Sequence, residues 1–274
     1  MKCVSQALGR LKLALVGVML GMIMASTTVN AAAVAFGGVV VAGCTLSGLT
    51  YTCASSPTTN VDIVSLGVNY IVSIDGGSGD IYADTATLGV GAVIHGNLIA
   101  TTTITLGVDS YVTGNATAGT TAILGAGAYV IRNMKAGTTA TLGAFSYVGR
   151  NMNAASATLG ANAYVCLNIT AGTALFGADA YVHGDLKVTT ATLGANAYVN
   201  RDLIATTVTM GAGGYVGGAL VATTATLGAG VCYGSDETTG LKTRTIGSGA
   251  GVGVCPPIRP RTSCSPIIYV RENY

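Results

Sequence analysis

One short pattern recurs along most of this 274-residue chain: a hydrophobic residue followed by glycine, at a nearly constant interval. The regular series is Leu88-Gly89, Leu106-Gly107, Leu124-Gly125, Leu142-Gly143, Leu159-Gly160, Phe176-Gly177, Leu193-Gly194, Met210-Gly211 and Leu227-Gly228, with intervals of 18 and then 17. Leu66-Gly67 and Ile246-Gly247 extend it with irregular intervals of 22 and 19, as atypical end units do. A fixed short period indicates stacked repeats, each of which buries its apolar face only against its neighbours.

Within each repeat, apolar residues alternate with polar ones in three short runs, and this period of two predicts strands. One inward column, five residues after the glycine, consists of Ile94, Val112, Val130, Val148, Val165, Val182, Val199 and Val216. A second, eleven residues after it, consists of Ala100, Ala118, Ala136, Ala154, Ala171, Val188, Ala205 and Ala222. We therefore predict an all-β fold, a single-stranded parallel β-helix: a three-sided β-solenoid of about ten 17-18-residue coils over residues 61–247.

The composition agrees with a narrow tube and excludes some partners. Half of the residues are hydrophobic, but only 6% are aromatic, 9% are charged, and none is Trp. Without Lys2, Arg10 and Lys12, which lie in the leader described next, the 13 basic residues fall to 10 against 11 acidic ones. A net charge of −1 predicts no nucleic-acid partner.

The N-terminal segment 1–31 has the features of a secretory signal peptide. A basic start precedes an apolar stretch, Leu13 to Ala25, and Val29-Asn30-Ala31 supplies a cleavage site. No later stretch reaches the roughly 18 apolar residues of a transmembrane span. We expect a secreted or cell-surface protein with an N-terminal cap over 32–60 and a C-terminal cap or tail over 248–274. The alternative, a lipoprotein box at Val41-Ala42-Gly43-Cys44, lies well beyond the apolar stretch.

Six cysteines remain after the leader: Cys44, Cys53, Cys166, Cys232, Cys255 and Cys264. An even number in an exported chain predicts disulfides. The segment from Cys44 to Cys53 is predicted to form a hairpin about Gly48-Leu49, with a type II′ turn that places the two cysteines opposite each other. A Cys44–Cys53 disulfide follows, whereas the pairing of the other four cysteines stays open. The sequence has no Cys-x-x-Cys pair, so zinc is not predicted.

Eight residues after the glycine stands a column of amides and acids, preceded mostly by Gly or Arg: Asn97, Asn115, Asn133, Asn151, Asn168, Asp185 and Asp202. Stacked side-chain amides hydrogen-bond from coil to coil and tolerate left-handed backbone, so this column predicts a corner.

The runs Val93-Ile-His-Gly-Asn-Leu-Ile-Ala100 and Tyr181-Val-His-Gly-Asp-Leu-Lys-Val188 resemble the repeat of the bactofilin family of polymer-forming bacterial β-solenoids. The resemblance covers roughly Leu88 to Gly228. It implies a right-handed β-helix that polymerises end to end without a nucleotide. The signal peptide, the cysteine-bearing ends and the outward Thr and Tyr columns depart from the family pattern.

Two outward threonine ranks are expected on one flat face, four and two residues before each glycine. Their members include Thr85, Thr87, Thr103, Thr105, Thr139, Thr141, Thr190, Thr192, Thr207, Thr209, Thr224 and Thr226, while Ile123 and Leu175 interrupt one rank. The Thr-x-Thr pattern resembles the face of β-solenoid antifreeze proteins, which implies binding to ice. The alternative is that threonine is simply a favourable exposed strand residue.

An aromatic ladder is expected on a second face, four residues after the glycine: Tyr111, Tyr129, Tyr147, Tyr164, Tyr181, Tyr198 and Tyr215. Stacked rings stabilise a solenoid without any ligand, and they could also bind the sugar rings of a polysaccharide.

The sequence singles out no catalytic or cofactor residues. His95 and His183 are five coils apart, about 24 Å at the β spacing, and Asp185 and Asp202 belong to the corner column. We predict a non-enzymatic structural or adhesive solenoid that needs no cofactor. Its partner would be itself or an extended surface such as cell envelope, polysaccharide or ice. Ice binding is the second hypothesis, and a polysaccharide-acting enzyme is a distant third.

Overall fold

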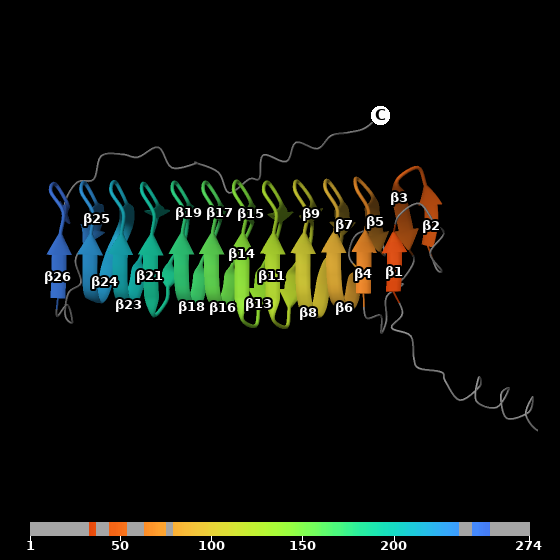
Figure 1. The fold of residues 1–274 in the computed structure, drawn as a ribbon, viewed down its shortest axis with the longest axis horizontal. Coiled ribbons are helices and arrows are strands. Elements are labelled where there is room, and N and C mark those ends of the chain that lie inside the picture. The colour runs from red at the N-terminus through yellow and green to blue at the C-terminus, as the bar shows by residue number, and fades with distance from the viewer. Residues whose placement is uncertain (1–32, 37–43, 54–62, 75–78, 236–242, 253–274) are drawn as a thin grey trace, which may run out of the picture. The chain divides into compact units, whose positions relative to one another are not determined.

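The computed structural model describes residues 33–36, 44–53, 63–74, 79–235 and 243–252, all within one compact unit. These residues form strands and turns without any helix. Their pairing makes a parallel β-solenoid of about ten turns with roughly 17 residues each, which confirms the predicted fold class (Figure 1). The predicted signal peptide, 1–31, and the residues after Val252, with Cys255 and Cys264, lie outside the described residues.

Two long ladders of strands run the length of the stack. The first contains β1 (Ala33–Phe36), β4 (Ile63–Leu66), β6 (Asp80–Leu88), β8 (Asn97–Leu106), β10 (Ala116–Ala118), β11 (Thr121–Leu124), β13 (Met134–Ala136), β14 (Thr139–Leu142), β16 (Met152–Leu159), β18 (Ile169–Phe176), β20 (Leu186–Lys187), β21 (Thr190–Leu193), β23 (Leu203–Met210) and β26 (Thr243–Ile246). The second contains β2 (Cys44–Ser47), β3 (Thr50–Cys53), β5 (Ile71–Ile74), β7 (Val93–His95), β9 (Tyr111–Val112), β12 (Tyr129–Val130), β15 (Tyr147–Val148), β17 (Tyr164–Val165), β19 (Tyr181–Val182), β22 (Tyr198–Val199), β25 (Cys232–Ser235) and β27 (Gly251–Val252). β24 (Tyr215–Leu227) belongs to both ladders.

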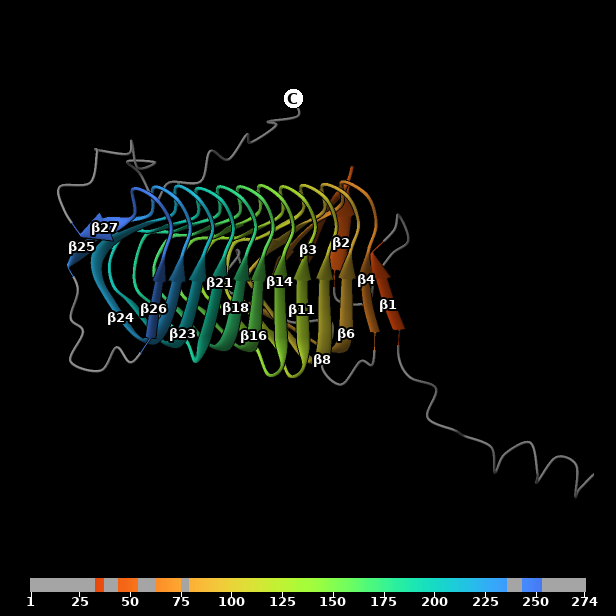
Figure 2. The same cartoon turned by 60° about the vertical axis from the view of Figure 1, so that its left-hand side comes forward.

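The three predicted runs of each coil are present, but they are not always three separate strands. In β6, β8, β16, β18 and β23 the second and third runs form one strand, and in β24 all three do. Pairing between consecutive coils is parallel and keeps equivalent positions opposite each other, for example Val148 opposite Val165. The view in Figure 2 shows the coils following one another in this way.

The tube interior is filled by the predicted inward columns. Every residue of the Ile94-to-Val216 column is fully buried. The alanine column is buried or half-buried, with Ala171, Val188 and Ala205 packed at its margin. A tyrosine occupies the valine column at each end of the stack: Tyr51 and Tyr233 are both fully buried. These two columns thus use small side chains, with a large ring near each end, while Phe176 in the middle of the stack is a third large buried ring.

The left-handed backbone lies at a different corner from the amide column. Asn69, Asp109, Phe145, Asn162, Asp179 and Asn196 have φ between 53° and 60°, and Gly91, Gly127, Gly213, Gly230 and Gly249 have φ between 64° and 72°. All of them stand two residues after the repeat glycine, in the tight turn that follows it. The amide column does mark a corner, but its residues are not among those with positive φ. Tolerance of left-handed backbone is therefore not the reason that amides occupy this corner.

The 18-residue and 17-residue coils differ in length at a third corner. The longer coils carry one additional residue there, Thr102, Thr120 or Thr138. The hydroxyls of Thr120 and Thr138 each donate to the backbone carbonyl of the preceding member, both at 2.8 Å. These corners appear as small loops beside β11 and β13 in Figure 1. Thr120 and Thr138 lie between strands, Thr102 lies within β8, and the inward and outward columns stay in register on both sides of the extra residue.

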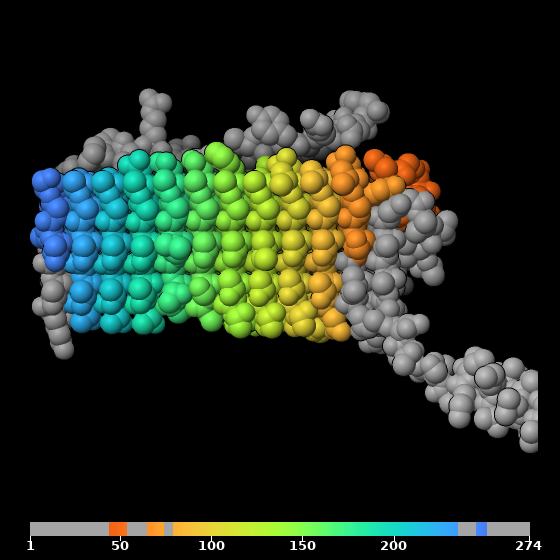
Figure 3. Space-filling model, viewed as in Figure 1, coloured from red at the N-terminus to blue at the C-terminus, as the bar shows by residue number. Residues whose placement is uncertain are grey.

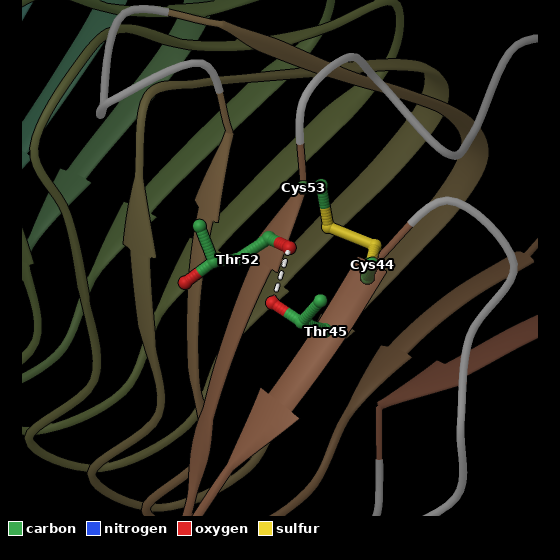
Figure 4. Close-up of a disulfide and its surroundings, with 4 residues drawn as sticks. All are labelled: Cys44, Thr45, Thr52 and Cys53. Atoms are coloured by element: carbon green, nitrogen blue, oxygen red, sulfur yellow. Dashed lines mark hydrogen bonds between the residues drawn. A yellow bond between two sulfur atoms is a disulfide. The ribbon is translucent and has the colours of Figure 1, made fainter.

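The N-terminal hairpin has the predicted register and disulfide. β2 and β3 are antiparallel, with Cys44 opposite Cys53, and the two sulfurs are bonded (Figure 4). Gly48 has φ of 59°, as the first central position of a type II′ turn requires. A lipoprotein needs the Cys44 sulfur for its lipid, so the bond to Cys53 argues against the lipoprotein alternative. β3 then pairs in parallel with β5, which joins the hairpin to the second ladder.

Candidate functional site

The face toward the viewer in Figure 1 carries the two threonine ranks, on β6, β8, β11, β14, β16, β18, β21, β23, β24 and β26. Each predicted member lies directly opposite its equivalent in the next coil, as Thr190 does opposite Thr207 and Thr192 opposite Thr209. Ile63 and Ser65 of β4 continue the ranks at the N-terminal end, which the irregular spacing concealed in the sequence. The space-filling view in Figure 3 shows the resulting straight rows of side chains across the coils.

The side chains of both ranks point outward. Their members are half-buried or exposed, whereas the residues between them, such as Ala191 and Val208, are buried. Neighbouring coils in a parallel ladder lie about 4.8 Å apart, and alternate residues of a strand lie about 6.5 to 7 Å apart. The hydroxyls and methyls therefore form a two-dimensional grid with these two spacings.

Two apolar side chains interrupt the grid, as the sequence predicts. Ile123 and Leu175 occupy one rank at positions where the other coils have threonine, and Leu175 is 51% exposed. Both are in register with their neighbours, so the sheet beneath them is not disturbed. The interruption is chemical only: a hydroxyl is replaced by a bulkier apolar group.

The second face carries the tyrosine ladder, and only part of it is a ring stack. Consecutive rings from Tyr147 to Tyr215 have centroids 4.4 to 5.5 Å apart and planes within 10° of each other. Tyr129 is tilted by 58° relative to Tyr147. Tyr111 instead contacts the ring of His95 edge-on, with centroids 6.1 Å apart. Cys232 continues the column after Tyr215, a position the sequence did not reveal as part of the ladder.

The stacked rings form a cluster of their own outside the tube. Tyr147, Tyr164, Tyr181 and Tyr198 are all buried, together with Cys166. Burial, and to a lesser degree the neighbouring Tyr164, raises the pKa of Tyr147 to about 12. The pKa values of Tyr181 and Tyr198 are also raised, mainly by burial. The ladder is thus a desolvated surface rather than a row of solvated phenols.

The corner column forms a hydrogen-bonded ladder from coil to coil. The side-chain oxygen of Asn115 accepts from the backbone N–H of Asn133 at 3.1 Å and from its side-chain amide at 3.0 Å. The same oxygen accepts in Asn97, Asn133, Asn151 and Asn168. Asp80 extends the column before Asn97. The column therefore has a structural role at this corner.

The carboxylates considered for catalysis belong to this ladder. Asp185 accepts from the backbone N–H of Asp202 at 3.4 Å, and Asp202 accepts from that of Ala219 at 2.9 Å. His183 hydrogen-bonds the hydroxyl of Tyr181 at 3.0 Å, and His95 lies near Tyr111. Among the described residues, no three His, Cys, Asp or Glu side chains gather where they could hold a metal ion.

Two cysteines whose pairing was left open are now constrained. Cys166 lies two residues after Tyr164, the ladder residue of the same coil. Cys232 occupies the ladder position of its own coil, opposite Tyr215, and both cysteines are disulfide-bonded.

Within the ranges that the structure describes, no helix is long and apolar enough to cross a membrane.

Comparison with protein-family models, curated proteins and solved structures finds no match for this chain. The class of protein therefore rests on the fold: a parallel β-solenoid with repeated coils, a threonine face and a tyrosine ladder.

Proposed function

We propose that this chain is a non-enzymatic β-solenoid of the cell exterior that attaches to an extended, regular surface in a structural or adhesive role. The observation that supports this proposal is the pair of threonine ranks, whose positions stay in register through every coil from β6 to β26. A surface that repeats in two dimensions suits an equally repetitive target better than a single small ligand. The resemblance to polymer-forming solenoids adds a second chain as one such target.

The disulfides support an exterior location. Cys44–Cys53 is formed, and Cys166 and Cys232 are bonded as well. Disulfides persist in oxidising compartments and are rare in the cytosol. The predicted signal peptide agrees with export.

The side chains with catalytic potential support a non-enzymatic role. Asp185 and Asp202 both accept backbone hydrogen bonds at the corner. An acid–base pair needs two carboxylates in different environments, so that their pKa values separate. The two aspartates occupy equivalent positions in adjacent coils, and the column otherwise carries amides.

Ice is the second candidate surface, and the Thr-x-Thr grid specifically favours it. Each threonine presents a hydroxyl and a methyl at two fixed spacings, as the resemblance to β-solenoid antifreeze proteins implies. Thermal hysteresis and ice shaping, measured on purified mature protein at high concentration, test this candidate. Their absence would reject ice and leave the structural or adhesive role.

One substitution tests the threonine face for any target. Thr190→Tyr places a bulky group at the centre of a rank, while Thr170→Tyr places the same group on an exposed strand position outside the ranks. We expect Thr190→Tyr to release the exported protein from washed cells, or to abolish ice activity, with an unchanged circular dichroism spectrum. Thr170→Tyr should behave as the wild type.

Two outcomes would contradict the proposal. Equal behaviour of both variants would show that the threonine face binds nothing. A wild-type protein found only in the medium, without filaments in electron micrographs and without ice activity, would reject the structural or adhesive role.

A further inference from the structure

Three basic side chains lie close together on two consecutive coils, beside the amide corner. Arg132 precedes β13, Arg150 precedes β16, and Lys135 is the middle residue of β13. All three side chains are exposed. The other Lys and Arg side chains of the described residues are Lys187, Arg201 and Arg244. Half of the described basic side chains thus lie on two of about ten coils.

The pairing between the two coils fixes the relative positions of these residues. The backbone N–H of Arg150 donates to the carbonyl of Arg132 at 3.1 Å, so the two arginines stand side by side on neighbouring coils. Lys135 lies directly opposite Asn153, which is also exposed. The coils are about 4.8 Å apart, and three residue steps along a coil span at most about 10 Å. We call this compact group, Arg132, Lys135, Arg150 and Asn153, the basic patch.

Among the described residues, no carboxylate lies close to the basic patch along the amide corner. Asp80 is three coil steps before the coil of Arg132, and Asp185 is two steps after the coil of Arg150. These separations are about 14 Å and about 10 Å. Both exceed the Debye length of about 8 Å at physiological ionic strength, so these charges are largely screened from the patch. The other described acids lie at other corners or further along the stack: Asp84, Asp109, Asp179 and Asp202.

The equivalent cations further along the stack do have carboxylates beside them. Lys187 stands in the column of Lys135, and Arg201 stands in the column of Arg132 and Arg150. An aspartate lies within two residues of each of these later cations, namely Asp185 and Asp202. The basic patch therefore differs from the other basic positions in its lack of a local negative charge.

The side chains of the basic patch suit an anion that also carries hydroxyl groups. Like charges opposite each other on neighbouring strands destabilise a sheet, and an anion bound between Arg132 and Arg150 would remove that repulsion. Each guanidinium group presents its N–H donors in a fork that fits two oxygens of one carboxylate, sulfate or phosphate. The Lys135 ammonium group adds a third charge. The amide of Asn153 supplies a neutral donor and acceptor for a hydroxyl group.

We propose that the basic patch binds an acidic polysaccharide through the anionic groups and hydroxyls of its sugar units. Anionic lipid surfaces are typically recognised by clusters of about four to eight Lys or Arg residues, and nucleic acids by an extended basic surface. Three cations are too few for either partner. Together with Asn153 they match a glycan that carries both charges and hydroxyls. The patch lies outside the threonine ranks, so this inference does not depend on the function proposed for them.

Binding of the exported protein to polygalacturonate, whose sugars carry carboxylates, tests the proposal, with neutral dextran as the uncharged control polymer. In affinity electrophoresis we expect retention by polygalacturonate at about 0.01 M salt and no retention by dextran. Retention should disappear near about 1 M salt, where the Debye length is only about 3 Å. Dextran sulfate replaces the carboxylates by sulfates, and retention by either acidic polymer supports the proposal. Absence of retention by both acidic polymers would overturn it.

Two matched double variants test the location of the site. Arg132→Gln/Lys135→Gln removes two charges from the basic patch and should weaken binding at least about tenfold, because it removes charge-assisted contacts. Lys187→Gln/Arg201→Gln removes two charges from the same columns, next to aspartates, and should bind as the wild type does. All four positions are exposed, so the circular dichroism spectra and Tm values should not change. Equal weakening in both variants would show that net charge alone governs binding and would overturn the proposed site.

Vesicles that contain phosphatidylglycerol test a membrane surface as the alternative partner. We expect the wild type and the Arg132→Gln/Lys135→Gln variant to behave alike on these vesicles. Vesicle binding by the wild type that this variant loses, without retention by either acidic polymer, would assign the patch to a membrane surface and overturn the proposal.

Discussion

Replacement of Gly177 by alanine tests whether the glycine column sets the spacing between coils. A Cβ at Gly177 would lie 2.8 Å from the backbone nitrogen of Ala161 and 2.9 Å from the carbonyl carbon of Gly160. Ordinary contacts between such atoms begin near 3.5 Å, so the coils would have to separate by about 0.6 Å. The hydrogen bond from the N–H of Gly177 to the carbonyl of Leu159, now 2.7 Å, would lengthen accordingly.

The expected cost follows from these contacts. Overpacking against backbone typically costs about 1–3 kcal/mol. Alanine also restricts the unfolded chain and thereby returns about 0.4–1 kcal/mol. With both ranges at their midpoints, the net loss of unfolding free energy is about 1.3 kcal/mol, which corresponds to a fall in Tm of roughly 3–5 °C for a domain of this size.

Urea and thermal denaturation, followed by circular dichroism, measure this loss. Ala178→Ser is the control, because Ala178 is the next residue and its side chain is exposed. We expect the control to stay within about 0.5 kcal/mol of the wild type. A Gly177→Ala protein as stable as the wild type, or more stable, would refute the close approach of the coils at this column.

Three further predictions concern the core, the corner and the ladder. Val165→Asp places a carboxylate at a fully buried position of the inward column and should cost several kcal/mol; unaltered thermal stability would contradict the inward placement. Asn133→Ala removes the oxygen that accepts two hydrogen bonds from Asn151 and should cost about 1 kcal/mol in urea denaturation, while a neutral result would mean that water replaces those bonds. Finally, the raised pKa of Tyr147, about 12, favours the neutral phenol in the folded state. The stability it contributes is present below the unfolded value near 10 and is lost as pH rises to about 12, so Tm should fall between these values; a constant Tm would argue against a desolvated ladder.

The repeat and the alternation of side chains were sufficient to predict the solenoid, its inward columns and the threonine ranks. Each of these depends on a period, either the alternation within a strand or the interval between successive repeat glycines, and a period can be counted in the sequence. The Cys44–Cys53 hairpin was also predictable, because a two-residue turn fixes the register of a short antiparallel pair.

Features that depend on contacts between coils required the tertiary structure. The repeat glycine is conspicuous in the sequence, but why the position needs glycine is visible only in the structure. At Gly177, a Cβ atom would lie too close to the backbone of the preceding coil. The left-handed turn two residues after it accepts Asn, Asp, Gly and even Phe145, so its composition did not reveal it. Likewise, a tyrosine column shows only that rings are adjacent. Which rings stack and which of them are buried depends on the packing around them, and that packing brings residues far apart in the chain to the same face.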